Sequence, residues 1–288
     1  MFLDTPVQQI HTEFIRSSKV EVFMKRDDLI HPFISGNKWR KLKYNIEAFK
    51  SQDKKMIVTF GGAFSNHLIA TAAACAQQSI SCLGIVRGDE LNRNSNYVLR
   101  LCEEFGMKLQ FVSRDEYRDK GLLEEKWKEK DCFVIPEGGD NENGRRGCEE
   151  IVPAYTSYEH VVVSVGTGTT FSGIIQASNG CSHIHGMSAV GNGAYLNSVV
   201  NDYVQHSNWT LHTNYAYGGF GKCDKEQSDF NTRFTRETGI LLDPVYTGKM
   251  IRGLYHMIEV GEIKSGERVL CIHTGGLTGL LSERWLNS

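Results

Sequence analysis

One lysine stands where the sequence predicts the start of a helix. Asn37 is a suitable N-cap residue, and apolar residues at helical spacing follow it. Lys38 then lies in the first helical turn, where the positive end of the helix dipole disfavours an ammonium group. A lysine with a lowered pKa can act as a free amine, either as a Schiff-base nucleophile or as a proton carrier. The alternative is an ordinary solvated basic face, because Lys41 and Asn45 continue the same side of the helix.

A loop rich in glycine and threonine offers a second kind of chemistry. It consists of Gly166, Thr167, Gly168, Thr169 and Thr170, and it lies between the apolar run 161–165 and a helix that we expect to begin near Phe171. Backbone N–H groups, hydroxyls and the positive end of a helix together form a phosphate cradle, although a plain turn is the alternative. Phe171 stands where a dinucleotide-binding motif needs its third glycine, which disfavours a nicotinamide dehydrogenase.

Three polar residues stand where another helix is expected to begin. Ser65, Asn66 and His67, together with the first backbone N–H groups of that helix, can bind a carboxylate or a phenolate oxygen. Helix capping alone would also explain Ser65, and a structural role would explain His67. The segment therefore predicts an anion site only in combination with other residues.

Short apolar, β-branched runs alternate with helical patterns along the whole chain, which is typical of an α/β fold with largely parallel sheets. The runs lie at residues 20–24, 56–60, 82–86, 108–112, 132–135, 161–165, 184–190, 240–246 and 268–273. Several end in glycine-rich loops, at 60–67, 136–144, 165–173 and 273–276. Ligands of open parallel sheets bind at the carboxyl ends of the strands, so we expect these loops to line one site. Tyr246, Thr247 and Thr274 stand at such strand ends as well.

A metal site is not expected. Cys181, His183 and His185 alternate along one predicted strand, but no carboxylate or further ligand lies nearby in the sequence. The eight cysteines are never two or three residues apart, which excludes a zinc ribbon and a thioredoxin-like pair.

Composition limits the function further. The 288 residues correspond to about two domains, and 40% hydrophobic residues suffice for a sizeable core. A net charge of −2 provides no positive field for nucleic acid or for an anionic membrane. No stretch of ~18 apolar residues is present, and the cysteine pattern is typical of reduced thiols, so we expect a cytoplasmic protein without membrane contact.

Seven motifs, in this order along the chain, resemble those of one enzyme family. They are KRDDL at 25–29, SGNKWRKLKY at 35–44, GGAFSNH at 61–67, IPEGG at 135–139, GTGTTFSG at 166–173, LLDPVYTGK at 241–249 and HTGG at 273–276. The family is that of D-cysteine desulfhydrase and 1-aminocyclopropane-1-carboxylate (ACC) deaminase, which are pyridoxal 5'-phosphate enzymes of the tryptophan-synthase-β-like fold, or fold type II. The resemblance implies two open, largely parallel sheets flanked by helices, a small amino-acid substrate and a homodimer.

The resemblance also implies roles for single residues. Lys38 would form the Schiff base with the cofactor, Asn66 would bind the cofactor's phenolic oxygen, and the loop 166–170 would hold its phosphate. Thr274 would offer a neutral hydrogen bond to the cofactor's ring. The residues implied to be catalytic are Lys38, Ser65 and Tyr246, and those implied to bind the substrate are Ser65, Asn66, His67, Tyr246 and Thr247.

Two positions bear on which reaction the enzyme catalyses. ACC deaminases carry Glu and Leu where this chain has Thr247 and Thr274, whereas desulfhydrase-like members carry Ser or Thr at both. The resemblance therefore favours α,β-elimination from D-cysteine, giving pyruvate, ammonia and sulfide, over ring opening. Phe220 stands where the family usually has a tyrosine, so a cofactor-binding protein with little catalytic activity is a further alternative. We expect residues 1–43 and 148–288 to form a large cofactor-binding domain and residues 44–147 a small inserted domain, with the cofactor between them.

Overall fold

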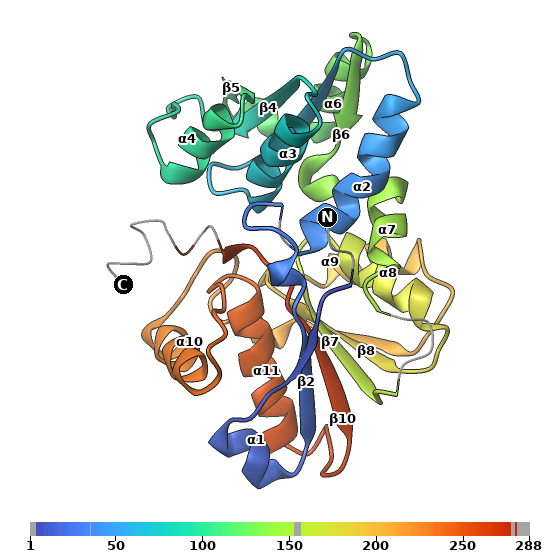
Figure 1. The fold of residues 1–288 in the computed structure, drawn as a ribbon, viewed down its shortest axis with the longest axis vertical. Coiled ribbons are helices and arrows are strands. Elements are labelled where there is room, and N and C mark those ends of the chain that lie inside the picture. The colour runs from blue at the N-terminus through green and yellow to red at the C-terminus, as the bar shows by residue number, and fades with distance from the viewer. Residues whose placement is uncertain (1–3, 35, 153–156, 278–279, 281–288) are drawn as a thin grey trace.

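Two sheets organise the structure, a computed structural model that describes residues 4–34, 36–152, 157–277 and 280. Ser35, the first residue of one quoted motif, lies outside these ranges. The six-stranded sheet has the order β1-β2-β10-β7-β8-β9 and the four-stranded sheet the order β5-β4-β3-β6, and Figure 1 shows them as the lower and upper parts of the molecule. All neighbouring strands are parallel except β1 and β2. The predicted fold class is confirmed.

The strands and helices have the following bounds. The strands are β1 (Val7–Gln9), β2 (Glu21–Lys25), β3 (Met56–Gly61), β4 (Cys82–Arg87), β5 (Lys108–Val112), β6 (Cys132–Ile135), β7 (His160–Val165), β8 (His183–Ser188), β9 (Trp209–His212) and β10 (Arg268–Ile272). The helices are α1 (Glu13–Ser18), α2 (Asn37–Lys50), α3 (Asn66–Gln77), α4 (Tyr97–Glu104), α5 (Arg114–Arg118), α6 (Lys120–Lys128), α7 (Glu142–Cys148), α8 (Thr169–Ser178), α9 (Tyr195–Asn201), α10 (Lys225–Thr238) and α11 (Thr247–Glu259). Short 3-10 turns are η1 (Asp27–Leu29), η2 (Glu137–Gly139) and η3 (Asn214–Ala216).

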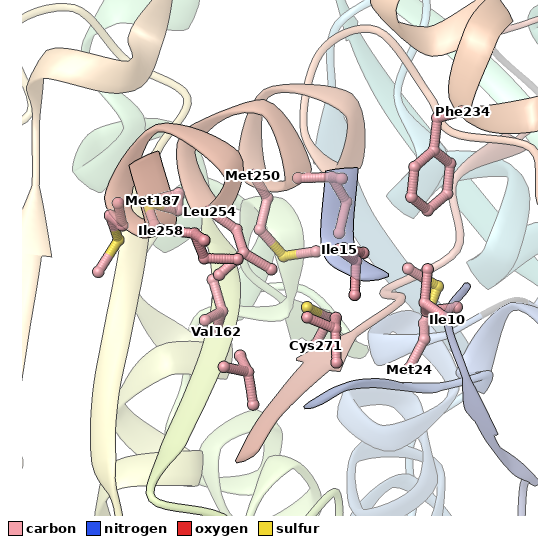
Figure 2. Packing of buried hydrophobic residues seen from close by; sticks show 14 of the residues in the cluster. Ile10, Ile15, Met24, Val162, Met187, Phe234, Met250, Leu254, Ile258 and Cys271 are labelled. Atoms are coloured by element: carbon pink, nitrogen blue, oxygen red, sulfur yellow. The ribbon is translucent and has the colours of Figure 1, made fainter. Parts of the chain in front are cut away.

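Helices cover both faces of the six-stranded sheet, which explains why its strands are apolar on both sides. On one face, Met250 and Leu254 of α11 pack with Val162 of β7 and Cys271 of β10, as Figure 2 shows. On the other face, Ile174 of α8 belongs to a second cluster with the β7 valines that precede and follow Val162. Burying one such side chain contributes ~1.5–3 kcal/mol. These two layers hold the carboxyl ends of β7 and β10 side by side.

One predicted strand is wrong. Residues 240–246 form no strand in the described structure, although each of the other predicted runs does. Pro244 lacks an N–H group for a sheet. The Asp243 carboxylate instead accepts hydrogen bonds from the backbone N–H groups of Val245, Tyr246 and Thr247 at 2.8–2.9 Å. These bonds turn the chain directly into α11.

Two predicted helix starts also need correction. The N-cap of α2 is Gly36 rather than Asn37, which is the first helical residue. The helix after the glycine- and threonine-rich loop begins at Thr169, ahead of Phe171, because Gly168 with φ of 91° serves as its N-cap. In both α2 and α8, the first helical turn therefore directly follows the glycine that ends the preceding loop.

The division into two domains remains a proposal. The strands of the four-stranded sheet all lie within residues 56–135, but the proposed boundaries fall inside α2 and α7. These two helices pack closely: a Cβ atom on Gly147 would lie 1.8 Å from the Arg40 carbonyl oxygen. We propose this helix pair as the connection between the domains.

Candidate active site

A cavity of about 630 Å³ lies where loops from both sheets meet. Among the residues that line it are members of all four glycine-rich loops: Gly62, Ser65, Asn66, His67, Glu137, Gly138, Gly166, Thr167, Gly168, Thr170, Thr274, Gly275 and Gly276. As expected from the sequence, these loops line one cavity. A cavity of this volume is in the range that holds a cofactor-sized ligand.

Lys38 projects into this cavity from the first turn of α2. The turn starts at Gly36, which has φ of 60° and lies so close to Thr274 that a Cβ atom would come within 1.9 Å of its carbonyl oxygen. Lys38 Nζ donates to Asn37 Oδ1 at 3.2 Å. Burial, followed by the positive charge of Lys41, lowers the pKa of Lys38 to about 7. At neutral pH, Lys38 is therefore a neutral amine in a large fraction of the protein molecules.

The alternative of a solvated basic face is wrong, because Lys41 and Asn45 are buried, with exposed fractions of 3% and 0%. Lys41 Nζ donates to the Gly138 carbonyl oxygen at 2.9 Å, and burial lowers the pKa of its amine. Asn45 exchanges side-chain hydrogen bonds of 2.8 and 3.1 Å with Asn141, the N-cap of α7. This side of α2 thus faces the cavity and α7 rather than water.

The glycine- and threonine-rich loop presents the N-terminus of α8 to the cavity. No side chain caps this helix, so its first N–H groups remain available for an anion. Asn37 Nδ2 donates to Thr170 Oγ1 at 2.9 Å, which ties the loop to the lysine-bearing helix. Thr169 does not line the cavity: its hydroxyl donates to Asp140 Oδ1 at 2.8 Å. Its side chain therefore supports the loop from behind.

The start of α3 forms another wall of the cavity. Ser65 caps the helix by accepting hydrogen bonds from the N–H groups of His67 and Leu68 at 3.2 and 3.3 Å. Asn66 lines the cavity and lies against Gly276, where a Cβ atom would come within 2.8 Å of Asn66 Nδ2. The side chain and the first backbone groups of α3 are thus close to the Gly275–Gly276 turn.

His67 is buried, and its protonation can be assigned from its partner. Thr59 Oγ1 lies 2.8 Å from His67 Nε2 and donates its own proton to the Ile135 carbonyl oxygen at 2.9 Å. His67 Nε2 must therefore be the donor to Thr59, which leaves Nδ1 as an acceptor without a hydrogen-bond partner among the described residues. Burial, with the charges of Lys38 and Lys41, holds the pKa of His67 well below its usual range. The imidazole is neutral at pH 7.

Tyr246 and Thr247 point in different directions. Tyr246 lines the cavity next to Gly166, and burial together with the Asp243 charge raises the pKa of its phenol, which stays protonated. The Thr247 hydroxyl instead donates to Asp243 Oδ2 at 2.7 Å, and Thr247 does not line the cavity. The structure thus brings Tyr246, but not the Thr247 side chain, to the predicted site.

The ends of β7 and β10 add a pair of hydroxyls. Thr274 Oγ1 and Ser164 Oγ are both buried, line the cavity and lie 3.3 Å apart. Ser164 was not singled out from the sequence, although a serine within the run Val161–Val165 was a usable signal. Arg87 and Glu137 also line the cavity and were not selected. Arg87 is the last residue of β4, so its position at a strand end was the signal.

Among the described residues, neither the predicted histidine strand nor the helices provide what a metal site or a membrane span requires. Side chains of His, Cys, Asp and Glu form no group of three or more that could hold a metal ion in the described part of the chain. His183 instead bonds Thr210 Oγ1 at 2.8 Å, and His185 lies between His160 and His212 at 3.0 and 3.1 Å. No helix among the described residues is long and apolar enough to cross a membrane.

Comparisons with known proteins agree on one family. The family model described as "Pyridoxal-phosphate dependent enzyme" matches residues 2–275. A putative 1-aminocyclopropane-1-carboxylate deaminase of Pyrococcus abyssi is 30% identical, over 96% of this chain and 90% of its own length. A bifunctional D-cysteine desulfhydrase/1-aminocyclopropane-1-carboxylate deaminase, mitochondrial, of Arabidopsis thaliana is also 30% identical, over 98% of this chain and 78% of its own length. A crystal structure of an ACC deaminase homologue superposes with a TM-score of 0.82 at 26% identity, covering 96% and 90% of the two chains.

Proposed function

Because this chain belongs to the pyridoxal-phosphate dependent enzyme family, we propose that it catalyses α,β-elimination of sulfide from D-cysteine, after which water hydrolyses the remaining three-carbon product to pyruvate and ammonia. The chain is a pyridoxal-phosphate dependent lyase of the ACC deaminase and D-cysteine desulfhydrase group. The proposal rests above all on one observation, which is that the Lys38 amine, with a pKa near 7, shares a cavity with an uncapped helix N-terminus.

The residues of the cavity fit pyridoxal phosphate. The N-terminus of α8, with Gly166, Thr167, Gly168 and Thr170, offers donors for its phosphate. Ser164 and Thr274 offer neutral hydroxyls for the ring nitrogen, Asn66 an amide for the phenolic oxygen, and Lys38 an amine for the aldehyde. When bound, the cofactor supplies the electron sink that stabilises a carbanion next to the amino group.

The protein's own groups would bind the substrate and move its protons. We assign the α-proton to Lys38 Nζ, since an amine with a pKa near 7 can both accept and return a proton at neutral pH. The start of α3, with Ser65, Asn66 and His67, would hold the carboxylate through the Ser65 hydroxyl proton and the Asn66 amide. Tyr246 would donate its phenolic proton to the departing sulfur, because its raised pKa keeps that proton in place.

The second candidate is ACC deaminase, which is named in the descriptions of the Pyrococcus and Arabidopsis relatives. Two neutral hydroxyls, those of Ser164 and Thr274, line the cavity beside each other. Neutral groups do not enforce protonation of the cofactor's ring nitrogen, so they favour elimination over the more demanding ring opening. Thr247, the other position that separates the two activities, is bonded to Asp243 instead. A binding protein with little activity is the third candidate, motivated by Phe220.

The decisive experiment is an absorption spectrum of the purified protein with pyridoxal phosphate, for wild type and Lys38→Ala. We expect a visible band that depends on Lys38, followed by release of sulfide and pyruvate from D-cysteine. A matched assay with ACC separates the two enzyme reactions. A Lys38-dependent band without turnover of either substrate would contradict the elimination proposal and favour the binding protein.

Two more parts of the proposal concern the whole molecule. We propose a homodimer and a cytoplasmic location, as the sequence analysis expects. Light scattering of the purified protein measures the first, and fractionation of cells that express it measures the second. A monomeric mass or a membrane or organelle fraction would overturn the corresponding part.

A further inference from the structure

One lysine of α11 is buried without a carboxylate partner. Lys249 is 1% exposed, and none of the ion pairs in the described part of the chain includes it. Its Nζ donates instead to the carbonyl oxygens of Ala216 and Gly219, at 2.6 and 2.7 Å. An ammonium group buried in this way is costly unless its hydrogen bonds serve the structure around it.

The Gly219 carbonyl group belongs to a loop, and the Ala216 carbonyl group directly precedes it. In residues 217–221, here called the Phe220 loop, every residue except Phe220 has a positive φ: 41° at Tyr217, 86° at Gly218, 100° at Gly219 and 66° at Gly221. Positive φ is strained for Tyr217, which is not a glycine. The two Lys249 hydrogen bonds, to Ala216 and Gly219, therefore lie on either side of Tyr217 and hold its strained conformation.

A second cation of the same helix supports the loop. The Arg252 guanidinium lies 3.9 Å from the centre of the Tyr217 ring and forms an ion pair of 2.6 Å with Glu226. Lys249 and Arg252 are three residues apart and lie on the same side of α11. The loop is thus fastened to one helix at its first residue, Tyr217, and at its middle residue, Gly219.

The held loop presents an aromatic ring to the candidate active site. Phe220 lines the cavity and is 57% exposed, unlike the other aromatic rings packed on α11. Its ring meets that of Tyr246 edge to face, with 5.9 Å between the centres. Tyr246 immediately precedes α11, so both rings are positioned by the same helix.

We propose that Lys249 is a positioning residue that fixes the Phe220 loop, and that the Phe220 ring forms an apolar wall which selects amino acids with a small uncharged side chain. This inference rests on the proposed function, since it names the class of side chain that fits next to Tyr246. A phenyl ring contributes contact area but no hydrogen bond or charge, so a charged side chain placed against it loses water without compensation.

Limited digestion with trypsin tests the positioning role without any cofactor. Lys222 is exposed and directly follows the loop, so cleavage after it reports how often the loop opens. We expect Lys249→Met to be cut after Lys222 about tenfold faster than wild type, because hydrogen bonds from a charged donor are lost. The control is Lys55→Met, at an exposed lysine that directly precedes β3, which should be cut at the wild-type rate. Equal rates for wild type and Lys249→Met would overturn the positioning role.

Binding of two amino acids tests the wall. In the cofactor-loaded protein, spectral titration should show that D-alanine binds at least about tenfold more tightly than D-aspartate. The ratio of the two dissociation constants should fall toward one in Phe220→Ala and in Lys249→Met. The absorption band and the melting temperature of Phe220→Ala should stay as in wild type. Equal binding of both amino acids to the wild type, or an unchanged preference in Phe220→Ala, would overturn the wall.

The two proposals fail in different ways. If the wild type lacks a Lys38-dependent band, the proposed function and the wall fall together, whereas the digestion result still decides the role of Lys249. If Lys249→Met does not fold, the exposed position of Phe220 makes Phe220→Ala the variant that decides the wall.

Discussion

Removing the Lys38 amine should stabilise the protein when no cofactor is present. The fold lowers the pKa of this lysine from 10.5 to about 7, chiefly by burial, so the folded state disfavours its charged form. Between these two pH values the unfolded chain holds a proton on Lys38 that the folded chain has lost, and stability therefore rises with pH. Below pH 7 both states are charged and the folded state carries the full penalty. Lys38→Met removes that penalty.

The size of the effect follows from the same pKa. Each tenfold change in proton affinity corresponds to ~1.4 kcal/mol, so the fall to about 7 amounts to on the order of 5 kcal/mol. Lys38 keeps partial contact with water in the cavity, which reduces the penalty. We expect Lys38→Met to gain about 2 kcal/mol in free energy of unfolding near pH 7, and less at higher pH.

Urea denaturation of the cofactor-free protein at pH 6, 7, 9 and 10 provides the measurement, with the difference between variant and wild type taken at each pH. Lys55→Met, at an exposed lysine, serves as the control and should change little. The reasoning is refuted if Lys38→Met destabilises the protein near pH 7, or if its advantage does not shrink between pH 7 and pH 10.

Three further predictions concern the supports of the site. Gly36→Ala should lower the free energy of unfolding by more than ~2 kcal/mol in urea, because the new methyl group meets the Thr274 carbonyl oxygen at a positive φ; an unchanged midpoint would contradict the close approach. Thr59→Val should cost ~1–3 kcal/mol in the same assay, since it leaves the His67 Nε2–H group buried without its acceptor, whereas Thr59→Ser should retain most of the stability. Asn37→Ala should weaken pyridoxal phosphate binding about fivefold in a spectral titration, because Thr170 loses its donor; an unchanged affinity would show that the bond does not support the phosphate loop.

The general position of the site could be predicted from the sequence. Glycine-rich loops at the ends of parallel strands must meet at one edge of each sheet, and this rule predicts the shared cavity of Asn66, Thr170 and Thr274. What the rule does not determine is where a hydroxyl points. Thr169 and Thr247 stand next to lining residues in the sequence, yet each donates to a buried or half-buried aspartate, Asp140 or Asp243, that comes from a distant or irregular segment.

The strand predicted at 240–246 failed for a related reason. Its apolar residues, Ile240 and Leu242, are buried, as strand residues would be. They reach the core from an irregular segment because the Asp243 carboxylate accepts three consecutive backbone N–H groups. A pattern of apolar residues reports burial, and it does not distinguish a sheet partner from a side chain as the acceptor of those groups.

The environment of Lys38 shows most clearly what the sequence cannot supply. The helix dipole was the sequence-based reason to expect a lowered pKa, but burial is the larger cause and Lys41 the next. The packing of α7 against α2 contributes to this environment, and it depends on Gly147 meeting the Arg40 carbonyl oxygen and on Asn45 pairing with Asn141. These contacts join segments about a hundred residues apart. The chemistry expected of one lysine thus depends on packing between distant segments as well as on the residues near it in the chain.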